Sequence, residues 1–315
     1  AILESRNAIG GTWDLFRYPG IRSDSDMFTL GYNFKPWTNP KAIADGHSIR
    51  EYIRETSREH GVDKHIRFGH KILKSSWSSD DAVWTVDVER ADTGKTVQYT
   101  CNFLFMCTGY YKYDAGYTPH FEGRDRFKGQ IIHPQHWPEN LDYSGKKVVI
   151  IGSGATAVTL LPAMADKAGH VTMLQRSPTY FIPGRNGNDL VDNLRKLEVK
   201  EEWIHEIARR QILFDQGEFT RRSMEEPDVV REELLSGVRA FLPEETVQKH
   251  FAPSYRPWRQ RIAFVPDGDI FQGIASGKAS VVTDEIERFT EKGIMLKSGT
   301  EPAIFRLKRP SDLIA

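Results

Sequence analysis

The sequence predicts an α/β fold with two Rossmann-like dinucleotide-binding domains, the first of them incomplete, and a helical insertion. One observation is an apolar run at residues 148–151 that leads directly into a glycine turn at 152–157 and then a helical pattern. This order of strand, turn and helix forms the phosphate-binding start of a dinucleotide domain. A second observation is that the chain opens with an apolar strand ending in an acid, Glu4, as a ribose-binding strand does.

Length and composition agree with two ordinary domains. The chain has 315 residues, with 43 basic and 43 acidic side chains, and 39% of its residues are hydrophobic. This balance gives no electrostatic reason for a nucleic-acid partner. No apolar run approaches the roughly 18 residues of a membrane-spanning helix. Cys101 and Cys107 form neither a disulfide framework nor a C-x-x-C pair, and no metal-ligand spacing occurs. We therefore expect a cytoplasmic enzyme without a metal.

Residues 1–140 are expected to form the first domain. Roughly 30 residues, comprising a strand, a glycine turn and a helix, would normally precede an acid such as Glu4, and the sequence lacks them. Further along, the pattern predicts a helix at 48–60 that begins at Ser48 and stops at Gly61. It then predicts alternating strands with a hairpin turn at 92–95, followed by a fully apolar, buried strand at 103–107.

Residues 141–299 are expected to form the second domain. Its predicted elements are a strand at 148–151, a helix at 155–166, a strand at 170–176, a helical insertion at about 189–250 with breaks at Pro227 and Pro243, a proline-bracketed connector at 256–266 and strands within 279–297. Residues 300–315 lack the apolar strand expected next. We interpret them as a divergent tail.

The glycine turn predicts an NADP site. Its first glycine permits the tight turn, its second lets the backbone meet a pyrophosphate, and its alanine packs closely on the strand. The next strand ends in Gln175 and Arg176, where an NAD site would have an acid and where arginine accommodates the 2′-phosphate of NADP. The alternative is that Arg176 is only a solvated charge. The predicted NADP-binding residues here are Gly152, Ser153, Gly154, Ala155, Thr156, Ala157, Gln175 and Arg176.

Residues 127–138 carry the most specific motif, F-x-G-x-x-x-H-x-x-x-W-P. Its fixed positions are Phe127, Gly129, His133, Trp137 and Pro138. Together with the glycine turn, it resembles the fingerprint of flavin-dependent Baeyer–Villiger monooxygenases, and residues 10–26 are similar to the ethionamide-activating subgroup of that family. The resemblance implies FAD and NADP as cofactors, bound by the first and second domains, with residues 127–138 linking the two. It also implies O2 as co-substrate and a small hydrophobic ketone or a sulfur compound as substrate.

The resemblance also assigns site residues. For FAD it implies Glu4, Gly11, Thr12, Trp13, Asp14, Leu15, Asp24 and Ile72, and to the NADP set it adds Arg22, Ser23 and Asp24. It aligns Arg261 with an active-site arginine that stabilises negative charge during oxygen transfer, held in place by Asp24. These two are the predicted catalytic residues, although on spacing alone Arg256 and Arg259 compete with Arg261. His133 is expected to be structural rather than a general base.

Two other functions fit the same sequence. One is a flavin N- or S-oxygenase that forms no esters, because such enzymes share several of these motifs. The other is a non-catalytic NADP-binding fragment, because the flavin-side glycine turn is missing and retention of FAD by this chain is in doubt. Flavin colour and oxygen-dependent consumption of NADPH would distinguish an enzyme from such a fragment.

Overall fold

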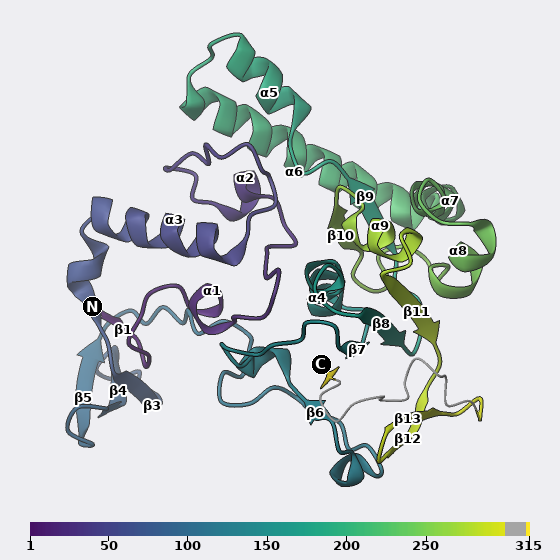
Figure 1. Cartoon of the computed structure of the whole chain (residues 1–315). Coiled ribbons are helices and arrows are strands. Elements are labelled where there is room, and N and C mark those ends of the chain that lie inside the picture. Colours follow the sequence, from purple (N-terminus) through teal and green to yellow (C-terminus); the bar gives the residue numbers. More distant parts are fainter. Residues whose placement is uncertain (300–312) are drawn as a thin grey trace. The chain divides into compact units, whose positions relative to one another are not determined.

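The computed structural model describes residues 1–299 and 313–315. The chain divides into two compact units (Figure 1). The first unit comprises Ala1–Leu15 and Gly46–Gly116, and the second comprises Phe16–Asp45 and Tyr117–Ala315. Each unit is therefore built from two separate stretches of the sequence.

The first unit combines one long helix with short strands. Its elements are β1 (Ile2–Leu3), α1 (Thr12–Leu15), α3 (Gly46–Glu59), the 3-10 turn η1 (Val62–His65), β2 (Ile66–Arg67), β3 (His70–Ser78), β4 (Val83–Arg90) and β5 (Thr96–Cys101). Helix α3 buries Ile49 and Tyr52, as the apolar spacing predicts. It begins two residues before the predicted N-cap Ser48, so Ser48 lies in its first turn. Gly61 follows its end in the left-handed region.

The strands of the first unit confirm the predicted hairpin. β3, β4 and β5 pair in antiparallel order, and Gly94 takes a positive φ of 64° in the turn between β4 and β5. Val86 and Val88, on one face of β4, are buried, in keeping with the alternation of an antiparallel sheet. β1 pairs in parallel with β2. The strand predicted at the start of the chain is thus present.

The buried strand predicted at 103–107 is wrong. These residues form no strand, and Phe103, Phe105 and Met106 are 77%, 75% and 61% exposed. An apolar run becomes a buried strand only when partner strands take up its backbone groups and other elements cover both faces. Within the described residues no strand pairs with this run.

The second unit is an α/β assembly with a helical insertion. Its elements are α2 (Met27–Leu30), η2 (Arg124–Arg126), β6 (Gln130–Ile131), η3 (Pro134–His136), β7 (Lys147–Ile151), α4 (Ala155–Ala165), β8 (His170–Gln175), β9 (Phe181–Gly184), α5 (Asp189–Lys196), α6 (Glu201–Glu225), α7 (Pro227–Arg239), α8 (Glu244–His250), β10 (Ala263–Pro266), α9 (Asp269–Ala275), β11 (Ala279–Thr283), β12 (Ile286–Thr290), β13 (Gly293–Leu296) and β14 (Leu313–Ile314). The predicted insertion corresponds to α5 to α8, and its predicted breaks coincide with the starts of α7 and α8.

The main sheet of this unit is parallel and runs in the order β11–β8–β7–β14–β6. Helix α4 packs on β7 and β8 (Figure 1). Val148, Val149 and Ile150 of β7 are nearly inaccessible, as expected for a strand covered on both faces. On one side the core continues through Phe127 and Phe289, whose rings meet edge to face at 5.9 Å. The predicted strand–turn–helix start is confirmed.

Residues 16–45 pack with the second unit, whereas the sequence grouped them with residues 1–140. Gly20, with φ +73°, lies so close to α4 that a Cβ would come within 2.6 Å of the Ala163 Cβ. Arg22 forms an ion pair with Asp269 at 2.5 Å. These contacts explain why the segment clusters with the second unit.

Most of the predicted divergent tail, residues 300–312, lies outside the described residues. Its last residues form β14, which pairs in parallel with both β6 and β7. The backbone N–H of Ala315 donates to the Val149 carbonyl at 2.9 Å. A strand therefore follows Gly299 after all, later than the pattern suggested.

No helix among residues 1–299 and 313–315 is long and apolar enough to cross a membrane.

Candidate cofactor sites

A pocket of about 760 Å³ lies on α7 and is lined by Asp228, Glu232 and Glu233 among others. Its carboxylates make it a poor match for an anionic cofactor. A second pocket, of about 610 Å³, is lined by the predicted glycine turn, Arg176, Asp24 and Arg261. This pocket brings together residues that are far apart in the sequence, and its glycine turn and arginines suit an anionic cofactor.

The glycine turn has the geometry of a phosphate cradle. Gly152 has φ +121°, and its N–H donates to the Leu174 carbonyl at 2.8 Å. Helix α4 starts after Gly154 without a side-chain cap, so its first N–H groups have no side-chain acceptor at that position. A Cβ added to Gly152 or Gly154 would meet no atom within 4 Å. The turn therefore has open space in front of uncapped donors, which fits a pyrophosphate.

The residues beside the turn differ in where their side chains go. Arg176 and Ser177 are exposed at the pocket, and Ser153 Oγ lies 3.0 Å from Thr179 Oγ1. Gln175, predicted as an NADP contact, is 1% exposed, and its Nε2 donates to the His250 carbonyl at 2.7 Å. Its side chain thus ties β8 to the end of α8. Thr156 is half-buried in α4, and Ala157 is buried there.

Arg261 and Asp24 meet in this pocket. Nη2 of Arg261 lies 2.6 Å from Oδ2 of Asp24, and their side chains are 64% and 36% exposed. The predicted contact between them is therefore present, although they are 237 residues apart in the sequence (261 minus 24). Arg256 and Arg259 are also exposed, but neither is among the residues that line this pocket.

The two residues before Asp24 hold its segment in place. The Arg22 guanidinium is engaged by Asp269 at the start of α9. Ser23 is 4% exposed, its N–H donates to the Ala44 carbonyl at 2.9 Å, and its Oγ accepts from the Ala44 N–H at 3.2 Å. Arg22 and Ser23, both predicted to contact NADP, thus fix the backbone that carries Asp24.

Sequence reasoning missed two acids in the pocket, Asp284 and Glu285. They follow β11, at the carboxyl edge of the parallel sheet, where α/β folds bind ligands. A hydrogen bond from Ser298 lowers the pKa of Asp284. A hydrogen bond from Lys297, whose Nζ lies 2.5 Å away, lowers the pKa of Glu285. Their position just after a strand of the dinucleotide-binding sheet is the signal that could have found them.

The fingerprint segment is part of the second unit. Phe127 is buried in the core, and Gln130–Ile131 form the edge strand β6. His133 is exposed and caps the short turn η3, with its Nδ1 accepting from the Gln135 N–H at 3.2 Å. Gly129 and Trp137 are half-buried, and Pro138 is exposed. The local contacts of His133 are those of a cap. Its predicted role in coupling two domains stays a prediction.

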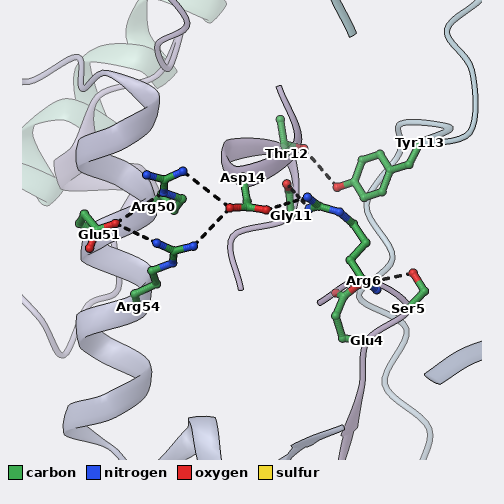
Figure 2. Close-up of polar contacts among 10 residues, drawn as sticks. All are labelled: Glu4, Ser5, Arg6, Gly11, Thr12, Asp14, Arg50, Glu51, Arg54 and Tyr113. Atoms are coloured by element: carbon green, nitrogen blue, oxygen red, sulfur yellow. Dashed lines mark hydrogen bonds and ion pairs between the residues drawn. The ribbon is translucent and has the colours of Figure 1, made fainter. Parts of the chain in front are cut away.

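The first unit holds most of the predicted FAD residues. Figure 2 shows the loop around Gly11 and Thr12, with Asp14 pointing to Arg50 and Arg54 on α3 and to Arg6 near the N-terminus. Asp14 is 7% exposed, so its carboxylate serves as an anchor for these arginines. A free ligand-binding acid would be more accessible.

The remaining predicted FAD residues surround the same loop or lie on the sheet. The Glu4 carboxylate accepts the Arg6 N–H at 2.8 Å, and Thr12 Oγ1 lies 3.3 Å from the Tyr113 hydroxyl. Trp13 and Leu15 are half-buried in α1, and Ile72 is half-buried in β3. A strand-end acid beside a loop with glycines at positive φ fits the ribose and the close backbone approach of a dinucleotide. The described residues contain no group of His, Cys, Asp and Glu able to hold a metal ion.

Comparison with known proteins identifies relatives. Residues 34–190 match the family model described as flavin-binding monooxygenase-like. The chain is 51% identical over 303 residues to the FAD-containing monooxygenase EthA of Mycobacterium tuberculosis (strain H37Rv), and 53% identical over 306 residues to EthA of Mycolicibacterium smegmatis. These alignments cover 96% and 95% of this chain, and 61% of each relative. The chain thus spans about three-fifths of the length of these relatives.

Solved structures share the fold. An oxidised steroid monooxygenase bound to NADP superposes with a TM-score of 0.74 at 22% identity, covering 99% of this chain and 65% of that one. An open cyclohexanone monooxygenase gives a TM-score of 0.72 at 20% identity, covering 99% and 67%. The architecture is thus that of Baeyer–Villiger monooxygenases with Rossmann-type domains. The family match and the EthA relatives show that the chain belongs to the flavin-binding monooxygenase-like family.

Proposed function

We propose that the protein acts in an FAD- and NADPH-dependent monooxygenation that transfers one oxygen atom of O2 to a small hydrophobic substrate. With a ketone the product would be an ester, and with a thioether or thioamide an S-oxide. The observation that carries this proposal is the pocket of the second unit, which contains the glycine turn, Arg176 and the Arg261–Asp24 pair. The relatives are named FAD-containing monooxygenases, which supports the same chemistry.

Each group in the pocket has a separate task in this proposal. The turn at Gly152 and Gly154 would bind the pyrophosphate of NADPH through backbone N–H groups. Arg176 would bind the 2′-phosphate by charge-assisted hydrogen bonds. FAD, when bound, would supply the chemistry that activates O2, and NADPH would be the hydride donor.

Arg261 would act on the substrate. When oxygen is transferred to a carbonyl carbon, negative charge develops on the carbonyl oxygen. A guanidinium held nearby stabilises that charge. Asp24, at 2.6 Å, orients the guanidinium. Because Arg261 is 64% exposed, its position depends on this ion pair more than on packing.

The function is tested by incubating the protein with FAD, NADPH, O2 and either a hydrophobic ketone or an aryl thioether. We expect ester from the first and S-oxide from the second. S-oxide without ester would favour the alternative of an N- or S-oxygenase. Binding of NADPH with no oxygenated product and no oxygen uptake would favour an NADP-binding protein without catalysis.

The substitution Arg261→Ala tests the catalytic arginine. We expect product formed per NADPH consumed to fall by a hundredfold or more, about the cost of losing one pre-organised electrostatic donor. Arg259→Ala is the matched control, because it removes a neighbouring exposed guanidinium outside the pocket. NADPH affinity should change little in either variant. If Arg259→Ala loses product and Arg261→Ala does not, the assignment belongs to Arg259.

A further inference from the structure

The carboxylate of Asp14 is buried within a group of arginines. Its Oδ2 accepts a hydrogen bond from Arg6 Nη2 at 2.7 Å, and its Oδ1 lies 3.3 Å from Arg54 Nη2 and 3.7 Å from Arg50 Nη1 (Figure 2). A carboxylate that is only 7% exposed needs such partners, because burial strips away its water. We call Asp14, Arg6, Arg50 and Arg54 the Asp14 cluster.

Arg6 differs from the other arginines of the cluster in what else it binds. Its Nη1 donates to the carbonyl oxygen of Gly11 at 2.9 Å. The same carbonyl accepts the N–H groups of Asp14 and Leu15 at 3.1 and 2.9 Å, which close the first turn of α1. One planar guanidinium therefore ties the loop backbone and the buried carboxylate together, which a lysine could not do with the same geometry.

The loop rests directly on this cluster. Gly10 has φ +125°, and a Cβ there would lie 3.1 Å from the Asp14 Cβ and 3.2 Å from the Arg50 Cγ. Gly11 has φ +51°, and a Cβ there would lie 3.3 Å from the Tyr113 hydroxyl. Both glycines hold conformations that other residues rarely adopt. The backbone conformation of the loop therefore depends on its contacts with the Asp14 cluster and with Tyr113.

We propose that Arg6 is a positioning residue for flavin binding. By holding the Gly11 carbonyl close to Asp14, it fixes residues 10–12 in the backbone conformation to which FAD binds. The inference rests on the proposed function and on the predicted FAD site, which includes Gly11 and Thr12. Arg54, which binds Asp14 and Glu51 but no loop carbonyl, is the matched control.

The test measures the dissociation constant of FAD, by quenching of flavin fluorescence, together with the midpoint of thermal unfolding without FAD. Arg6→Ala and Arg54→Ala each remove one guanidinium from Asp14, so both should lower the unfolding midpoint. Only Arg6→Ala removes the side-chain link between the Gly11 carbonyl and the Asp14 carboxylate. We expect its FAD dissociation constant to rise about tenfold or more, against less than about threefold for Arg54→Ala. Arg6→Lys keeps the charge near Asp14, so its FAD dissociation constant should lie between those of the wild type and Arg6→Ala. It replaces Arg6→Ala in the test if that variant does not fold.

The outcomes separate this inference from the proposed function. If the wild-type protein binds no FAD, the proposed flavin site fails and the inference fails with it. If the wild type binds FAD but the arginine variants weaken it equally, or only in proportion to their loss of thermal stability, Arg6 is merely structural. The same holds if Arg6→Lys binds FAD as tightly as the wild type, because a lysine cannot hold both groups in the same geometry. In those cases the inference alone is overturned.

Discussion

At the scale of single residues, position in a motif and direction of the side chain are separate properties. Gln175 is the last residue of β8 and Arg176 follows it, yet Gln175 is buried against the end of α8 while Arg176 lies at the pocket. Side chains alternate along a strand, so adjacent residues of one motif cannot share a ligand equally. Ser23 and Asp24, which lie in no strand, differ in the same way, because Ser23 is buried against Ala44 and only Asp24 lines the pocket.

This difference leads to a prediction about NADPH preference. If Arg176 binds the 2′-phosphate, Arg176→Ala should raise the dissociation constant of NADPH about tenfold or more, since a charge-assisted hydrogen bond contributes about 1.5–3 kcal/mol. The constant for NADH should stay the same. Both are measurable by isothermal titration calorimetry. Arg288→Ala is the control, because Arg288 pairs with Glu287 and does not line the pocket.

Two results would contradict the assignment in different ways. Equal constants for NADPH and NADH in the wild type would remove the NADP preference altogether. A clear preference that survives in Arg176→Ala would move the phosphate contact to another residue, and Ser177 at the same pocket would be the next to test.

At the scale of elements, the sequence correctly predicted the helices and turns that are stabilised by interactions among their own residues. Helices with an apolar stripe, such as α3, and turns with a required glycine, such as the one at Gly94, depend on local chemistry. The run at 103–107 depends on partner strands and covering helices, which periodicity cannot reveal. For the same reason the sequence could not place residues 16–45, whose packing depends on contacts with Ala163 and Asp269.

The packing of residues 16–45 on α4 gives a prediction about stability. Gly20→Ala would put a Cβ 2.6 Å from the Ala163 Cβ, at a backbone φ of +73°. We expect it to lower the free energy of unfolding by about 1–3 kcal/mol. The control is Gly217→Ala in α6, where a Cβ meets no atom within 4 Å and where helix propensity predicts a gain of up to about 1 kcal/mol.

Differential scanning calorimetry suits this measurement, because units that unfold separately give separate transitions. The transition that Gly20→Ala lowers should be the one that Gly217→Ala leaves unchanged or raises. An unchanged transition in Gly20→Ala would mean that residues 16–45 do not pack closely on α4.

At the scale of the whole molecule, the buried titratable groups differ between the two units: the first buries Asp14 and the second buries His205. In the second unit, burial is the main cause that lowers the pKa of His170, His205 and His250 below the ordinary value of 6.5. His205 is 2% exposed, and its Nδ1 is buried without a hydrogen-bond partner. Burial and the positive charge of Arg209 lower the pKa of His205. They outweigh the opposite effects of the Tyr32 carbonyl, Glu206 and Asp26, so the neutral ring is favoured.

The last prediction concerns the pH dependence of stability. The unfolded chain takes up protons on these histidines below about pH 6.5. In the folded second unit the same histidines take up protons only at lower pH, because their pKa values are lowered. The unfolded state therefore binds more protons in this range, and the free energy of unfolding must fall as pH falls. The free energy of unfolding should be greatest above about pH 7 and should decline between about pH 6.5 and 5. This decline should come before protonation of the carboxylates becomes important, because their ordinary pKa values are near 4. The measurement is urea denaturation at pH steps from 8 to 5, for the wild type and for His205→Leu, which removes one of these groups. The variant should show a shallower decline, whatever its stability at pH 8. A wild-type profile that is flat from pH 6.5 to 5 would mean that these histidines protonate as readily in the folded protein as in the unfolded chain.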